Sequence, residues 1–161
     1  MTGVQTCALP ICQIELFAFR EASGIFLSPF TSPNNIIIFV LDPAVAKNPA
    51  GLVSLLMLSS SIQFRFSTPM DLVLGKADLL EDEEVETILE HCSNPENLLF
   101  ALGQNDMDMR SVAAIEFLKA MESLGAQKIP KPVSSMEMSG IEDIYNSIQQ
   151  VFFGGEDLAP D

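Results

Sequence analysis

Apolar runs separated by proline, glycine and polar breaks divide this chain into short elements. The run NIIIFVL at Asn35–Leu41 is uninterrupted and rich in β-branched residues, which predicts a central parallel strand covered on both faces. A second apolar run at Met70–Leu74 predicts another strand. Between them, Asn48 and Pro49 supply an N-cap and a first-turn proline for a helix that continues to Phe66.

The flanking segments favour helices. QIELFAFREAS at Gln13–Ser23 places apolar residues on one face, and Gly24 follows to end that helix. Residues 79–127 read as a helical insert in three parts. Its first helix is expected to begin with Asp82 as cap, and to turn its apolar side inward through Val85, Ile88 and Leu89.

The end of the chain predicts one more strand and the clearest amphipathic helix. Lys128–Val133 is a strand by position, although its two prolines disfavour one. Ser139 and Glu142 form a capping box that opens the last helix. Helical spacing predicts that this helix buries the apolar residues Ile141, Ile144, Tyr145, Ile148, Val151 and Phe152.

Strands that alternate with helices predict an α/β fold, with right-handed crossovers and a parallel sheet flanked by helices. A length of 161 residues fits one domain, and 48% hydrophobic residues can form a core. The mean hydropathy of +0.29 fits strands buried on both faces.

The charge balance limits the partners. Asp and Glu number 22 against 8 Lys and Arg, a net charge of −14, so we expect no nucleic acid and no anionic membrane as partner. No apolar stretch reaches the roughly 20 residues of a spanning helix. Three cysteines without metal-ligand spacing fit free thiols in a reducing, cytoplasmic compartment, with Cys92 as a packed thiol.

Residues 1–11 (MTGVQTCALPI) carry no charge, no periodicity and no signal-peptide pattern. They resemble the translation of a sequencing-library adapter. We therefore expect residues 1–11 to be an artefact, residues 12–158 to be the C-terminal part of a domain, and 159–161 to be a tail.

Three loops at the carboxyl ends of the predicted strands are the places to look for a ligand, because open α/β sheets bind ligands there. They hold Asp42-Pro43, Gly75-Lys76-Ala77-Asp78 and Ser134-Ser135-Met136. Lys-x-Asp after a buried strand is typical of a guanine-reading loop. One carboxylate accepts hydrogen bonds from the ring N–H and exocyclic amine of guanine, a donor pair that adenine lacks.

Further stretches resemble the GPN-loop GTPase family. Gln13-Ile14-Glu15 is similar to the end of its Asp-Thr-Pro-Gly-Gln-Ile-Glu switch motif, and Leu41-Asp42-Pro43 with PAGLVSLLMLSSS at 49–61 is similar to its middle section. Ser134-Ser135-Met136 resembles the Ser-Ala-Lys loop that closes over the base, where backbone N–H groups make the contacts. The resemblance covers residues 13–158.

The resemblance implies a P-loop NTPase fold that binds GTP with Mg²⁺ and hydrolyses it, here without its phosphate-binding half. Family members are typically homodimers, and eukaryotic members assist RNA polymerase assembly. Gln13 matches the glutamine that orients the attacking water and is the catalytic candidate. Lys76, Asp78, Ser134, Ser135 and Met136 are the nucleotide-binding candidates, and no metal-binding residue is assigned.

The sequence departs from the family pattern. It has neither the phosphate cradle, GxxxxGK followed by Ser or Thr, nor a Gly-Pro-Asn tripeptide. Gly75 stands where the family usually has Asn, and Met136 where it usually has Lys. We therefore expect the fragment to retain neither GTP nor Mg²⁺, to be inactive alone, and to expose a sheet edge and apolar helix faces. Two alternatives stay open: a degenerate, non-catalytic assembly module of the same fold, and a P-loop relative specific for ATP.

Overall fold

The computed structural model describes residues 35–66, 68–103, 109–123 and 128–153. The predicted helix at Gln13–Ser23, the catalytic candidate Gln13, and the segments 1–11 and 159–161 lie outside the described residues.

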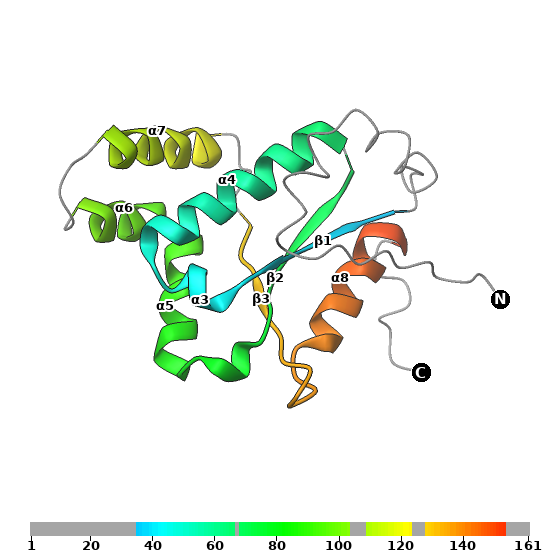
Figure 1. Cartoon of the computed structure of the whole chain (residues 1–161). Helices are drawn as coiled ribbons and strands as arrows, with labels where there is room; N and C mark the ends of the chain where they lie inside the picture. The colour runs from blue at the N-terminus through cyan, green and yellow to red at the C-terminus, as the bar shows by residue number, and fades with distance from the viewer. Residues whose placement is uncertain (1–34, 67, 104–108, 124–127, 154–161) are drawn as a thin grey trace.

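Strands and helices alternate along the described chain, as the sequence predicts (Figure 1). In chain order the elements are β1 (Ile37–Leu41), α3 (Pro43–Ala46), α4 (Pro49–Phe66), β2 (Met70–Leu74), the 3-10 turn η3 (Ala77–Leu79), α5 (Asp82–Ser93), α6 (Pro95–Gly103), α7 (Met109–Ser123), β3 (Lys131–Pro132) and α8 (Ile141–Phe153). The sequence pattern predicted neither the short helix α3 nor the turn η3.

The three described strands form a parallel sheet in the order β1-β2-β3. All five residues of β2 are buried, whereas Val40 of β1 is 48% exposed. The prediction that Asn35–Leu41 forms the central strand is therefore wrong for the described sheet: β2 is central and β1 lies at an edge. An apolar run predicts a strand, but it does not show how many strands flank it or whether both of its faces are covered.

β3 is much shorter than the predicted strand at Lys128–Val133. Pro130 and Pro132 have no N–H to donate, so the ladder cannot extend through them. Pairing resumes just beyond the strand, where the Val133 amide donates to the Leu74 carbonyl at 2.9 Å.

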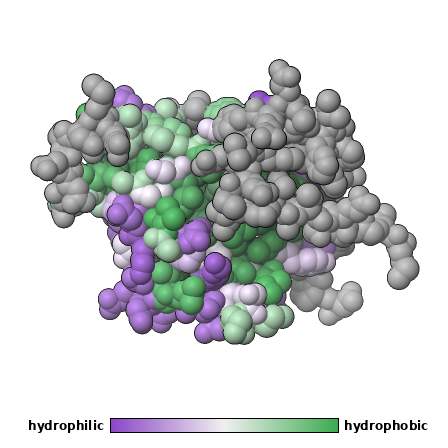
Figure 2. Space-filling view, viewed as in Figure 1, coloured by the Kyte–Doolittle hydropathy of each residue, from purple (hydrophilic) through white to green (hydrophobic). Residues whose placement is uncertain are grey.

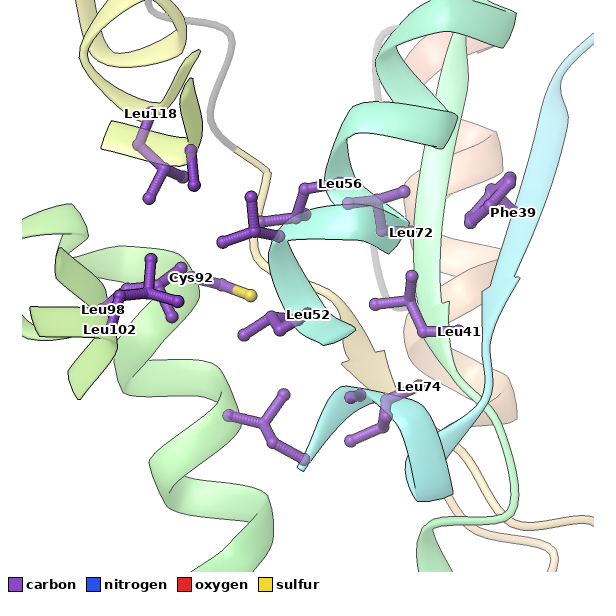
Figure 3. Close-up of a cluster of buried hydrophobic side chains, with 14 of the residues drawn as sticks. Phe39, Leu41, Leu52, Leu56, Leu72, Leu74, Cys92, Leu98, Leu102 and Leu118 are labelled. Carbon is purple, nitrogen blue, oxygen red and sulfur yellow. The ribbon is translucent and has the colours of Figure 1, made fainter. Parts of the chain in front are cut away.

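Helix α4 lies between the sheet and the helical insert and joins them in one core (Figure 3). Its Leu52 and Leu56 point between Leu41, Leu72 and Leu74 of the strands on one side and Cys92, Leu98 and Leu102 of α5 and α6 on the other. Burial raises the pKa of the Cys92 thiol to about 12, so this cysteine is a packed, protonated side chain, as predicted.

Helix α5 begins at Asp82 itself, so its cap lies one residue earlier than predicted. Glu81 is the N-cap, and its capping box with Glu84 replaces the expected Asp82 cap. The hydrogen bond from the Glu81 backbone, followed by that from Lys47, holds the pKa of Glu84 below its ordinary value. Ile88 is buried as predicted, and Figure 2 shows hydrophilic residues gathered over this acidic helix at the lower left.

Helix α8 lies on the face of the sheet opposite α4 (Figure 1). It begins after Gly140, not after the predicted Ser139 cap, because Ser139 pairs through its backbone with Ser134. Three residues predicted to be buried are largely exposed: Ile141 at 43%, Tyr145 at 56% and Val151 at 47%. The amphipathic spacing marks an apolar face correctly but does not reveal that no described element covers its outer side. Among the described residues, no helix is both long and apolar enough to cross a membrane.

We expect the chain to self-associate at micromolar concentrations through the exposed face of α8, because burying such a face removes apolar surface from water. The double variant Tyr145→Lys/Val151→Lys should shift the chain toward monomer in sedimentation velocity. Val112→Lys on α7, at a residue that is 50% exposed, is the matched control and should leave association unchanged. A wild-type chain that sediments as a monomer and melts cooperatively would contradict this expectation.

Candidate functional site

The loop after β2 presents two charged side chains at the carboxyl end of the central strand. Lys76 has φ 52, the left-handed conformation, which is uncommon for a residue other than glycine. The 3-10 turn that follows is closed by backbone hydrogen bonds from Leu79 to Lys76 and from Leu80 to Ala77, each 3.0 Å. Within the described residues, the exposed side chains of Lys76 and Asp78 have no hydrogen-bond partner, so both are available to a ligand.

The loop after β3 is a tight turn built around Ser134. Ser134 and Ser139 exchange backbone hydrogen bonds of 3.2 and 3.1 Å. The fully buried Ser134 hydroxyl oxygen accepts hydrogen bonds from the Met136 and Glu137 amides, at 3.2 and 3.1 Å. Ser134 thus holds the turn, whereas Ser135 and Met136 are exposed, Met136 at 84%.

A backbone hydrogen bond joins the two loops directly. The Ala77 amide donates to the Val133 carbonyl at 3.1 Å. The structure therefore brings Lys76 and Asp78 to the same edge of the sheet as Ser134, Ser135 and Met136. Within the described residues, the amides of Ser135 and Met138 are the two in this turn without an acceptor, because the Ser134 hydroxyl accepts from Met136 and Glu137. The exposed Asp78 carboxylate and the free Ser135 amide could form hydrogen bonds with a flat heterocycle that carries both donors and acceptors.

Gly75 lies against the neighbouring strand. A Cβ atom at this position would stand 2.7 Å from Cγ1 of Val40, and the Gly75 amide donates to the Leu41 carbonyl at 3.1 Å. Val40 thus occupies the space that a side chain at position 75 would enter.

The loop after β1 contributes no free group. The Asp42 carboxylate accepts a hydrogen bond of 2.9 Å from the Ala44 amide and caps α3. Asp42 therefore has a structural role within the described residues, although it lies at the carboxyl end of a strand, where a ligand-binding residue is expected.

A pocket of about 510 Å³ lies at the opposite, amino-terminal rim of the sheet. Its lining includes Pro69, Asp71, Lys128 and Ser147, none of which the sequence reasoning singled out. One feature of the sequence does indicate this pocket: Asp71 is a charged residue inside the apolar strand MDLVL. Burial lowers the pKa of Lys128, against the opposing effect of Asp71. This pocket is separate from the two loops and cannot be part of a site at the carboxyl ends.

We predict that Ser134→Ala destabilises the chain by about 1–2 kcal/mol, because two amides lose their acceptor. Urea denaturation measures the loss, and amide exchange should accelerate at Met136 and Glu137. Ser135→Ala removes an exposed hydroxyl from the same turn and should change stability by less than about 0.5 kcal/mol. Equal effects of the two substitutions would show that the Ser134 hydroxyl does not hold the turn.

Comparisons with known proteins identify the family and the fold of this chain. Residues 12–153 match a family model described as "Conserved hypothetical ATP binding protein". No curated protein sequence matches the chain.

Among solved structures, PAB0955, a GTPase in apo form from Pyrococcus abyssi, matches with a TM-score of 0.70 and 21% identity. The match covers 87% of this chain and 55% of that chain, so this chain spans just over half the length of that GTPase. At this identity the likeness shows the fold alone, a parallel sheet flanked by helices that matches part of that structure. Because the family model matches most of its sequence, the chain belongs to the family of conserved hypothetical ATP-binding proteins, the GPN-loop GTPases.

Proposed function

We propose that this chain forms the base-recognising part of a guanine-nucleotide site in a GPN-loop GTPase that binds and hydrolyses GTP. The observation that carries the proposal is the hydrogen bond from the Ala77 amide to the Val133 carbonyl. It holds the Lys-x-Asp loop against the serine turn at the rim where α/β proteins bind nucleotides.

The free groups at this rim match the polar edge of guanine. The Asp78 carboxylate would accept from the ring N–H and the exocyclic amine, and the Ser135 amide would donate to the ring carbonyl. The aliphatic stem of Lys76 would lie along the base. Adenine offers no such donor pair, so Asp78 would be covered by the bound base and left without a hydrogen-bond partner, which disfavours adenine.

Hydrolysis would involve residues outside the described ones. Gln13, at the position of the switch glutamine, would orient the attacking water. Among the described residues, no group of three or more His, Cys, Asp or Glu side chains could hold a metal ion.

Assembly as a homodimer and a role in RNA polymerase assembly follow from the family resemblance alone and belong to this proposal. A second function, that of a non-catalytic assembly module, is favoured by Gly75. Val40 fills the space that a side chain at this position of the base-recognising loop would need. The description of the family as ATP-binding keeps an adenine-specific site as a further alternative. The choice among the three depends on which base, if any, the two loops recognise.

We expect GMP to shift the amide NMR signals of Ala77, Asp78 and Ser135, with a dissociation constant on the order of millimolar, and AMP to bind several-fold more weakly. Asp78→Asn should weaken GMP and favour XMP, because an amide can donate to the carbonyl that replaces the exocyclic amine of guanine.

Asp82→Asn is the matched control: it removes an exposed carboxylate from the first turn of α5 and should leave the preference for GMP intact. Shifts of equal size with GMP and AMP would overturn guanine specificity. The absence of shifts with either nucleotide would favour the assembly module, and a preference for AMP would favour the adenine-specific relative.

Isothermal titration of this chain with GTP and Mg²⁺ at micromolar concentration should give no binding heat. Phosphate contacts dominate nucleotide affinity in such sites, and the sequence has no phosphate cradle. A micromolar dissociation constant would refute this expectation and would require a phosphate site that the sequence does not reveal.

A further inference from the structure

A carboxylate lies inside the central strand of the sheet. Asp71 is 9% exposed, between the buried residues Met70 and Leu72 of β2. One of its oxygens accepts from the Leu72 amide at 3.1 Å, and the other is 2.5 Å from Nζ of Lys131. The two side chains are partly buried, with 27% of the Lys131 side chain and 13% of the Asp71 side chain exposed. Such ion pairs are often no more stabilising than apolar residues of the same volume, but they can fix the register of the elements they join.

The Lys131 ammonium group connects three elements. Besides Asp71 of β2, it donates a hydrogen bond of 3.1 Å to the Ser147 hydroxyl of α8. Lys131 itself belongs to β3, with its Cα opposite Val73. Its side chain therefore reaches back toward the amino end of β2 while its backbone leads forward into the serine turn.

Few backbone hydrogen bonds fix β3 against β2; beyond the strand these are the bonds from the Val133 amide to Leu74 and from the Ala77 amide to Val133. The strand has two residues, and Pro132 cannot donate to the ladder. The start of α8 is also held close to β3, since a Cβ on Gly140 would stand 2.1 Å from the Pro132 carbonyl oxygen. With so few backbone hydrogen bonds, the Lys131 contacts are a large part of what fixes the register.

The register of β2 and β3 sets the distance between the two recognition groups, because the Asp78 carboxylate follows β2 and the Ser135 amide follows β3. A slip of one residue would move the Ser135 amide by about 3.3 Å relative to Asp78. A binding constellation tolerates displacements of only about 0.5 Å. Any residue that fixes the β2–β3 register therefore also fixes the spacing of the two groups.

We propose that Lys131 is a positioning residue: by bridging Asp71 and Ser147, it holds the Ser134–Ser139 turn in register with the Gly75–Asp78 loop. Its relevance to nucleobase recognition rests on the proposed function, whereas its effect on the turn does not. Lys131 touches no base and is not a catalytic residue.

The test compares Lys131→Met, Lys131→Arg and Lys128→Met in the full chain. Lys128 is the matched control, because it binds the Met70 carbonyl and Gln63 at the same rim and has no recorded contact with α8 in the described residues. Urea denaturation first gives the global stability of each variant. Native-state amide exchange at Ala77 and Val133, and titration with GMP and AMP, are then measured under conditions where every variant is folded.

Lys131→Met should accelerate exchange at Ala77 and Val133 by roughly tenfold beyond the change in global unfolding, and should abolish the preference for GMP over AMP. Lys131→Arg should restore both, and Lys128→Met should leave both unchanged. Exchange that only follows global stability in Lys131→Met would overturn the positioning role.

The two readouts separate this inference from the proposed function. If wild-type chain shows no preference for GMP while Lys131→Met still accelerates exchange at the two amides, the nucleobase assignment fails and the positioning of the turn stands. If GMP is preferred by both wild type and Lys131→Met, the nucleobase assignment stands and the positioning role fails.

Discussion

The hydrogen bond between the Ala77 amide and the Val133 carbonyl joins two loops that the whole helical insert separates in sequence. It forms only because β2 and β3 run parallel and end together, so that their carboxyl-terminal loops meet at one rim. That rim is supported by the packed core beneath the sheet. The strands carry Leu72 and Leu74, which pack against Leu52 and Leu56 of α4, and α4 in turn packs on the insert.

Much of this arrangement follows from sequence pattern. Met70–Leu74 and the helix from Pro49 to Phe66 have the predicted bounds, because a short, mostly apolar run after a proline and an Asn-Pro start are strong local signals. The meeting of the two loops also follows, since the order of strands and helices implies it. Local pattern could not reveal that β1 lies at an edge of the described sheet, or that no described element covers the apolar face of α8, because both depend on neighbouring elements.

The details of the site were less predictable for a different reason. The sequence marked Ser134 as a binding residue by resemblance, but its hydroxyl accepts from two backbone amides inside the turn. Which groups remain free depends on hydrogen bonds that close only when the turn forms. Likewise, Asp71 is an anomaly in the strand pattern, and its partners Lys131 and Ser147 come from distant elements. Sequence spacing cannot pair them.

The contact between Gly75 and Val40 has an evolutionary consequence. A larger residue at position 75 would collide with Cγ1 of Val40, which belongs to a different strand. A relative that bears asparagine in this loop therefore needs a smaller or differently rotated residue at the position of Val40. The two sites should covary among homologues, and a mutational path between glycine and asparagine should pass through the change on β1 first.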